Sequence, residues 1–386
     1  MGYVVERIDS IDQLSSIRDE WNDLLQRSET NIIFLTLECI LSWWKCFGKG
    51  KELFVLVVKN DEKLVAIAPL MITTLNLGIK IKKIEFISTA FPNYCDFIIS
   101  NECEDKRVVL RNIYDYLLKE KDSWDIISLE EIPEASSTLT YSEELLKNSD
   151  ISFNIFLDDI CPTLIFEGLQ RGEIEKKLNK RSIRRKLKCL NEAGSIEYDY
   201  CKDINEAIIL LDVFFQQHID RWKATSTPSI FEDERYKVLY RELMKSLLPK
   251  RWVDLSFLRF NEKPVAFQFG FVYNNRYEGY TSSYDTSYAT YSPGMILFKF
   301  NIENYLSNNF REFDLGRGDG SYKFRFSNKV RKNFKIRFYQ NHLFFVLDTT
   351  WEKTKEEIMK HDKLSQILSE SRDKTNKFYM DLFHKR

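Results

Sequence analysis

Apolar and polar positions recur along the chain with two periods, one typical of helices and one typical of strands. Apolar residues three and four positions apart predict helices at 10–27, 36–47, 106–120, 142–147 and 203–222. Short apolar runs predict strands at 53–58, 64–72, 82–88, 125–130 and 153–157. Because helices and strands recur in turn, we predict a mixed α/β (α+β) fold.

A strand–turn–strand unit occurs twice. Residues 51–72 contain an apolar run, a polar turn and a second apolar run that opens with Val-Ala at 65–66. Residues 251–272 repeat this order, with Val-Ala at 265–266. The distance between the two copies is too long for a solenoid repeat. The repeat therefore predicts two related domains, each with a central hairpin.

The domain boundary is predicted between residues 158 and 172, where acidic residues and glycines interrupt the apolar pattern. We expect an N-terminal domain at 1–165 and a second domain at 166–345. Residues 346–386 are charged and helical in pattern. They are expected to form a C-terminal extension, packed on the second domain or on a partner.

Most of the candidate chemistry lies in residues 277–329. Their pattern predicts a strand ending near Asp285, a Ser-Pro-Gly turn at 292–294 that begins a helix, a short strand at 312–315 and a Gly-rich loop at 316–320. The first turn of such a helix offers free N–H groups and a positive dipole end to a phosphate. The alternative is a strand–helix–strand packing unit with ordinary turns and no ligand.

Five short motifs occur together in the second half of the chain. They are His218, Arg221 and Trp222 in HIDRW; Tyr284 and Asp285 in SSYDTSY; Ser292-Pro293-Gly294-Met295; Phe313-Asp314 with Gly316-Arg317-Gly318; and Tyr322-Lys323. As a set they resemble the GNAT acyltransferase superfamily, and more narrowly its duplicated CelD-like acetyltransferase branch, which is related to the FemABX peptidyltransferases. In the first half, residues 68–70 and 94–96 fit the N-terminal domain of the same family. The usual glycine-rich phosphate loop is reduced here to Ser-Pro-Gly.

This resemblance implies two tandem GNAT-like domains, of which the second is catalytic. It implies an acetyl-CoA or other acyl-CoA donor, with an acyl carrier protein as another possible donor. The acceptor would be an amine of a small molecule, a sugar or a cell-envelope precursor. Two alternatives stay open: a FemABX-like transferase that uses aminoacyl-tRNA, and a non-catalytic GNAT-fold binding protein.

The candidate site residues follow from their chemistry and from the motifs. Acid–base candidates are His218, Asp285, Asp314, Asp319, Tyr322 and Lys323. The donor's phosphates are assigned to Ser292, Pro293, Gly294 and Met295, and the acceptor to Arg221, Trp222, Tyr284, Arg317 and Arg325.

Each of these residues also has an ordinary structural explanation. His218 can be a core histidine, Asp285 a turn cap, Asp314 an ion-pair partner and Asp319 a solvated side chain. Alternation in YKFRF predicts a strand with Lys323 and Arg325 on one face. A bulge at Gly279 in the strand 277–284 would expose a backbone N–H to the thioester carbonyl.

Residues 175–188 contain a dense group of cations. These are Lys176, Lys177, Lys180, Arg181, Arg184, Arg185, Lys186 and Lys188. Leucine and isoleucine recur at helical spacing in the same window, so it predicts an amphipathic helix with a basic face. That face is either solvated or in contact with phosphates or an acidic substrate; contact with nucleic acid is a third alternative.

Composition excludes several classes of protein. The formal net charge is −1, so the chain as a whole does not attract DNA. No apolar run approaches the ~20 residues of a membrane span, and no signal-peptide core is present. The 7 cysteines form no CxxC pair, and with 4 histidines no metal site is expected. We therefore predict a cytoplasmic protein with reduced thiols.

Overall fold

The computed structural model describes residues 2–76, 78–223, 225 and 227–359. Its contacts divide the chain into two compact units. Unit 1 contains the described residues up to Ile40, residues 48–159 and those from Lys332 onward, and unit 2 contains residues 41–47 and 160–331. Two long strands, β9 (Ser152–Ile165) and β15 (Lys329–Tyr339), contribute residues to both units.

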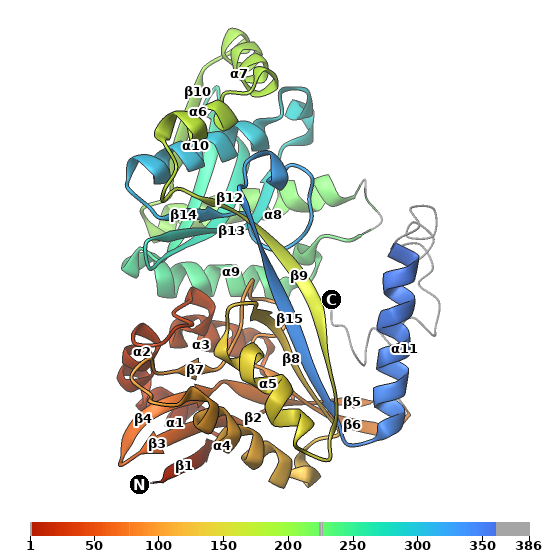
Figure 1. The fold of residues 1–386 in the computed structure, drawn as a ribbon. Coiled ribbons are helices and arrows are strands. Elements are labelled where there is room, and N and C mark those ends of the chain that lie inside the picture. Colours follow the sequence, from red (N-terminus) through yellow and green to blue (C-terminus); the bar gives the residue numbers. More distant parts are fainter. Residues whose placement is uncertain (1, 77, 224, 226, 360–386) are drawn as a thin grey trace. The chain divides into compact units, whose positions relative to one another are not determined.

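Unit 1 mixes helices with two groups of strands (Figure 1). Its remaining strands are β1 (Tyr3–Ile8), β2 (Lys51–Leu53), β3 (Val55–Asn60), β4 (Lys63–Ala68), β5 (Leu70–Asn76), β6 (Lys80–Phe86), β7 (Ile98–Ile99) and β8 (Ile126–Pro133). They are ordered β1-β3-β4-β7 and β9-β15-β8-β6-β5-β2. Its helices are α1 (Ile11–Ser16), α2 (Arg18–Gln26), η1 (Ile33–Leu35), α4 (Lys106–Lys119), η2 (Lys121–Ser123), α5 (Ser137–Lys147) and α11 (His342–Met359). Helix α3 (Leu37–Phe47) begins in unit 1 and ends in unit 2.

Unit 2 is built on strands β10 (Ile196–Tyr200), β11 (Val253–Phe260), β12 (Lys263–Tyr273), β13 (Arg276–Tyr284) and β14 (Glu312–Asp314). They are ordered β10-β11-β12-β13-β14, followed by the end of β9, and only the pair β13–β14 is parallel. The helices are α6 (Arg171–Leu178), α7 (Arg181–Ala193), α8 (Ile204–Trp222), α9 (Glu234–Leu247) and α10 (Pro293–Ser307). Short 3-10 segments are η3 (Ile230–Glu232), η4 (Leu248–Lys250), η5 (Thr286–Tyr291) and η6 (Lys323–Arg325).

The two hairpins recognised in the sequence hold equivalent positions in the two units. Each forms the second and third strands of an antiparallel series, β1-β3-β4-β7 in unit 1 and β10-β11-β12-β13 in unit 2. Ala66 pairs with Val58 and Ala266 with Leu258, and in both hairpins the register shifts directly after that pair. Both turns contain two residues with positive φ. This shared detail confirms a tandem α/β fold.

Alternation along β11 and β12 creates two cores in unit 2, one on each face of the sheet. Phe267 and Phe269 pack against Phe214 of α8 and Tyr240 of α9. The intervening Leu258 and Ala266 pack against α7 and α10, in a cluster with Leu190, Ile296 and Leu297. In Figure 1, α10 and α9 therefore lie on opposite faces of this sheet.

Some predicted elements are interrupted in the structure. The helix expected at 10–27 breaks at Ile17, and the basic window forms two helices separated by residues 179–180. The strand expected at 64–72 is divided at Pro69, which has no N–H to donate to a strand ladder. Local apolar periodicity does not reveal such breaks, because the apolar residues on either side remain in phase.

The domain limits predicted at 345 and 346 need correction. Residues 333–339 of β15 pair with β8, so they are bonded into unit 1 and not into the second domain. Helix α11 also belongs to unit 1, where Asp348 and Glu352 form ion pairs with β15. The rest of the predicted extension, residues 360–386, lies outside the described residues.

The contact between α11 and β15 is a buried ionic cluster. Arg337, with 0% of its surface exposed, pairs with Asp348 at 2.6 Å and with Glu130 at 3.0 Å. Lys335 pairs with Glu352 at 2.6 Å. Removing the cation from such a cluster leaves buried carboxylates without compensation, which is more costly than losing an exposed pair.

We predict that Arg337→Leu lowers the free energy of unfolding by about 3–5 kcal/mol, as expected for removal of one partner of a buried ion pair. Chemical denaturation measures the change. The matched control is Arg111→Leu on the exposed face of α4, which should stay within about 0.5 kcal/mol of the original protein. A loss below about 1 kcal/mol in Arg337→Leu would show that the cluster contributes little to stability.

Candidate active site

Strands β13 and β14 form a fork in unit 2. Their parallel ladder covers only residues 276–278 of β13 and ends at the pair Glu278–Asp314. Strand β13 then continues to Tyr284 without further pairing to β14. The stretch from Thr281 to Tyr284 therefore presents an edge to which an extended ligand can add as a strand.

A β-bulge lies at the start of this fork. Gly270 pairs with Gly279 and Phe269 with Thr281, so Tyr280 is the extra residue of β13. A Cβ on Gly279 would lie 3.1 Å from Nε2 of Gln268 and 3.3 Å from the carbonyl oxygen of Asp314, which explains the glycine. The bulge expected at Gly279 thus lies one residue further on, at Tyr280, and Gly279 itself is paired with Gly270.

Buried ion pairs hold the base of the fork together. Arg331 pairs with Glu312 at 2.6 Å and with Asp314 at 3.3 Å. Arg276 pairs with the same Glu312, and the Thr163 hydroxyl donates to Asp314 at 3.2 Å. Asp314, 1% exposed, also accepts the backbone N–H of Gly316 at 2.8 Å. In the structure this carboxylate is an ion-pair partner that joins β14 to its surroundings.

The first turn of α10 has no side-chain cap. Ser292 adopts the left-handed conformation, with φ 54° and ψ 53°, and its hydroxyl caps no N–H. Pro293 has no N–H, and the amides of Met295 and Ile296 bond to the Ser292 carbonyl at 3.0 and 3.3 Å. A Cβ on Gly294 would meet only Tyr284, at 3.7 Å. No hydrogen bond of the Gly294 amide is present among the described residues, and this amide belongs to the positive end of the helix.

Arg221, Tyr284 and Tyr322 converge near this turn from three separate segments. The guanidinium of Arg221 lies 4.7 Å from the ring centroid of Tyr284, and its Nη1 donates to the Ser282 carbonyl at 3.3 Å. The ring of Tyr322 packs on Phe298 of α10 at 5.4 Å. Burial raises the pKa of Tyr322, and the Arg221 cation partly offsets that rise. The Tyr322 phenol therefore stays protonated at neutral pH.

His218 and Trp222 lie one turn apart on α8, next to Arg221. Their rings stack at 5.4 Å, and Nδ1 of His218 lies 2.7 Å from the Ser229 hydroxyl. His218 is 5% exposed, and burial together with the nearby Arg221 cation lowers its pKa to about 4. Its imidazole is therefore neutral at pH 7. The indole Nε1–H of Trp222 is buried and has no hydrogen-bond partner among the described residues.

The remaining predicted site residues have contacts or exposure of their own. Asp285 caps η5 through the amide of Ser287 and pairs with Lys263 at 2.8 Å. Asp319 and Arg325 are exposed. Arg317 is close enough to Tyr236 to lower the pKa of that phenol, against a larger rise caused by burial.

The strand expected for YKFRF is wrong, because Lys323–Arg325 form the 3-10 segment η6. Lys323 is buried there, and its ammonium donates to the carbonyl of Gly316 at 3.0 Å and to that of Arg317. The lysine thus binds the Gly-rich loop from within. Lys323 and Arg325 share no strand face.

Several residues of the site were not foreseen from the sequence. Ser229 holds His218, Ser282 anchors Arg221, and Thr163 and Arg331 hold Asp314. Ser229, Thr163 and Arg331 lie outside the motifs, and Ser282 opens the SSYDTSY motif; all four reach their partners through tertiary contacts. Only the alternation that gives Glu312 and Asp314 the same strand face indicated that a cation would be needed nearby.

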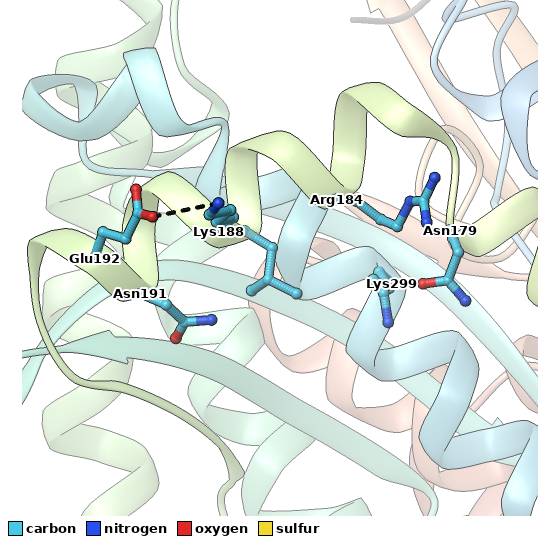
Figure 2. A pocket seen from close by; sticks show the side chains of 7 residues that line it. Asn179, Arg184, Lys188, Asn191, Glu192 and Lys299 are labelled. Carbon is cyan, nitrogen blue, oxygen red and sulfur yellow. Dashed lines mark ion pairs between the residues drawn. The ribbon is translucent and has the colours of Figure 1, made fainter.

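Two basic residues of α7, Arg184 and Lys188, border a surface hollow. The hollow, of about 560 Å³, is lined by Asn179, Arg184, Leu187, Lys188, Asn191, Glu192 and Lys299. Figure 2 shows Arg184 and Lys188 of α7 on one side of it and Lys299 of α10 on the other. In the described part of the chain, no group of three or more His, Cys, Asp or Glu side chains could hold a metal ion. None of the described helices is long and apolar enough to span a membrane.

Comparison with known proteins identifies the fold of unit 2. Residues 177–324 match the acetyltransferase (GNAT) domain family. The structure is similar to that of FemX, with a TM-score of 0.59, 9% identity and coverage of 89% of this chain and 99% of that one. It is also similar to a conserved protein of unknown function from Bacteroides thetaiotaomicron, with a TM-score of 0.52, 14% identity and coverage of 87% and 100%. No curated protein matches the sequence.

The lowered pKa of His218 predicts a pH-dependent stability. The unfolded chain takes up a proton near pH 6.5, whereas folded His218 does so only near pH 4. The contribution of neutral His218 to the free energy of unfolding is therefore present above pH 6.5 and is lost as the pH falls toward 4. Denaturation at about pH 7 and pH 5 should show that the original protein loses about 2 kcal/mol more than His218→Gln does. Equal losses in the two proteins would mean that His218 titrates normally.

Proposed function

Because this chain belongs to the GNAT superfamily and is an N-acyltransferase, we propose that it transfers an acetyl or longer acyl group from coenzyme A to an amine. The observation that carries the proposal is the meeting of two features in unit 2: the unpaired edge of β13 at 281–284 and the uncapped first turn of α10. Tyr284 at the end of that edge lies against Gly294 in that turn.

The two features suit different parts of one donor. The amides of the pantetheine arm would pair with the edge of β13, as an added strand does. The phosphates would lie at the first turn of α10, where the Gly294 amide and the helix dipole favour negative charge. The thioester carbonyl would then lie near the bulge, where backbone donors can stabilise the oxyanion.

In unit 1, the helix that corresponds to α10 has a capped first turn. There α4 follows β7 as α10 follows β13. The carboxylate of Asp105 caps α4 and accepts the amide of Arg107 at 2.9 Å. A negative side chain thus already occupies the position that an anionic ligand would need. We therefore assign donor binding to unit 2.

In the proposed reaction, the neutral amine attacks the carbonyl carbon of the thioester and forms the C–N bond. The C–S bond breaks, and the departing sulfur takes the phenolic proton of Tyr322. The phenolate recovers a proton from solvent, and the new amide loses its extra proton to water. Tyr322 suits the role of general acid because its pKa is raised, so the phenol is protonated at pH 7.

The acceptor is proposed to be a small or sugar-linked amine, such as a cell-envelope precursor. Three features support this acceptor class: the aromatic rings of Trp222 and Tyr284, the Arg221 cation over the Tyr284 ring, and the buried indole N–H of Trp222. Neutral His218 is assigned a positioning role, because it is stacked on Trp222 and bonded to Ser229. An acyl-CoA donor would place the reaction in the cytoplasm.

Acetyl-CoA binding is the direct test of this function. At about 100 times its dissociation constant, a bound donor should raise the free energy of unfolding by about 2.7 kcal/mol. Thermal denaturation with acetyl-CoA and with a longer acyl-CoA measures this rise. If neither donor changes the melting temperature, the chain does not use acyl-CoA.

We predict that Gly294→Trp weakens acetyl-CoA binding at least ~10-fold, since the indole would fill the space before the α10 turn. Calorimetric titration measures the affinity. The matched control is Gly172→Trp in the first turn of α6, where an added Cβ meets nothing within 4 Å. Both variants should melt cooperatively. Unchanged affinity in Gly294→Trp would remove the α10 turn from the donor site.

We predict that Tyr322→Phe lowers kcat about 100-fold while the affinity for acetyl-CoA stays the same, as loss of a general acid would. Thiol release from acetyl-CoA is followed with the amine that performs best in a screen of amino sugars and amino acids. Tyr200→Phe, on an exposed ring, is the control. Full activity in Tyr322→Phe would assign protonation of the thiolate to another group.

A further inference from the structure

Helix α7 carries a basic stripe, which we define as Arg181, Arg184, Arg185 and Lys188. The spacing of three, four and seven residues places these side chains on one face of the helix. All four are exposed, and Ile183 and Leu190 are buried on the other side. The stripe extends for about 10 Å along the helix axis.

The three arginines of the stripe are not used within the fold. No ion pair or hydrogen bond of their guanidinium groups is present among the described residues, and Lys188 has only a 3.7 Å contact with Glu192. Neighbouring cations differ: Lys177 donates to the Ser327 carbonyl at 3.0 Å, and Lys180 donates to that of Arg325 at 3.2 Å. The stripe is therefore available to a partner.

The helix that carries the stripe packs beside the segment that leads into the α10 turn. The ammonium of Lys186, on the same helix, donates to the carbonyl of Thr290, two residues before Ser292. Helix α7 also contacts η5 and α10. The stripe lies about 100–160° around the helix from Lys186, so it faces away from this contact. A partner bound to the stripe would reach the α10 turn with an extended arm that passes around α7.

The hollow in Figure 2 adjoins the same stripe. Arg184 and Lys188 belong to both the stripe and the hollow, and Leu187 adds an apolar wall. Across the hollow, the Lys299 ammonium is bonded to Glu303. The hollow can receive a side chain of a protein that lies along α7.

From these observations we propose that the basic stripe docks the acidic helix of an acyl carrier protein, which delivers its acylated phosphopantetheine arm to the fork between β13 and β14. The inference rests on the proposed acyltransferase function and adds a carrier-protein donor that uses the same turn as coenzyme A. The thioester then joins the acyl group to the carrier's own arm. Transfer to the amine forms the amide and returns the carrier with a free thiol, so no further reactant is needed.

The few hydrogen-bond donors at the α10 turn suit the single phosphate of such an arm. Pro293 has no N–H, the amides of Met295 and Ile296 are bonded to Ser292, and Gly294 is left to face the ligand. An arm attached to a carrier protein brings one phosphodiester to this turn.

Charge distribution favours a protein partner over a nucleic acid. The net charge of the chain is −1, so the stripe is a local feature. Exposed acidic residues lie near it on the same two helices, among them Glu173, Glu175 and Glu192. They interrupt the positive potential along which a long phosphate backbone would bind, whereas the length of the stripe matches a short acidic helix.

The test compares charge reversal of the stripe with a matched control. Arg181→Glu/Arg184→Glu/Arg185→Glu reverses the three unpaired arginines. Arg111→Glu/Lys119→Glu/Lys121→Glu makes the same change in net charge on exposed residues of unit 1. Fluorescence anisotropy measures binding of an acidic apo-acyl carrier protein, of its phosphopantetheine-bearing form, and of a tRNA. Calorimetry measures binding of acetyl-CoA and of dephospho-CoA.

We expect reversal of the stripe to weaken both carrier forms at least ~10-fold, and the control to change them less than ~2-fold. Acetyl-CoA affinity should remain within ~2-fold in both variants. Carrier binding should also weaken when salt rises from about 50 to 200 mM. Gly294→Trp should still bind the apo carrier, because docking precedes entry of the arm.

Three results would overturn the inference. Equal weakening by both triple variants would mean that net charge, not the stripe, attracts the carrier. Loss of acetyl-CoA binding with dephospho-CoA unaffected would assign the stripe to the ribose phosphate. Binding of tRNA, and not of the carrier, would assign it to nucleic acid. Failure of the proposed function looks different: the carrier would bind, but no acylated donor would lose its acyl group to any amine.

Discussion

The buried ion pairs at the base of the fork determine where the rest of the site can be. Glu312 and Asp314 point to the same side of β14, and Arg331 bonds to both at 2.6 and 3.3 Å. This contact fixes the short strand β14 beside the first three residues of β13. Because the ladder with β14 ends at Asp314, β13 continues past the bulge at Tyr280 paired with β12 only. An unpaired edge inside the sheet follows from that early ending.

The helices around the fork bring their ends to the same place. Helix α8 packs on β13 and places Arg221 against Tyr284, and α10 begins where Gly294 approaches the same tyrosine. A row of buried polar contacts keeps α10 in position: Asn301 donates to Ser256 at 2.8 Å and to Gln268 at 2.7 Å. Buried hydrogen bonds of this kind are costly to break, so the rotation of α10 about its axis is well specified. Because this rotation is fixed, the position of the first turn of α10 is fixed as well.

The duplicated fold explains how one chain can hold a donor-binding unit and a structural relative of it. Both hairpins share the register shift after the pair with Ala66 or Ala266, which depends on the local turn and alternation and not on any ligand. The two units differ at the start of the helix that follows. Asp105 closes the first turn of α4, whereas Ser292 leaves that of α10 open. The residue at the N-cap thus decides whether the first turn is closed by a carboxylate, as in α4, or left open to an anion, as in α10.

The sequence by itself determined the mixed α/β class, the repeated hairpins and the Ser-Pro-Gly helix start. These depend on local periodicity and on residues with special backbone preferences, which act over a few positions. Only the tertiary structure decided which polar residues meet. Asp314 is satisfied by Arg331, and Lys323 binds the carbonyls of the Gly-rich loop. A buried charge requires a partner, but that partner comes from any segment that the fold brings near, and one-dimensional spacing does not contain that information.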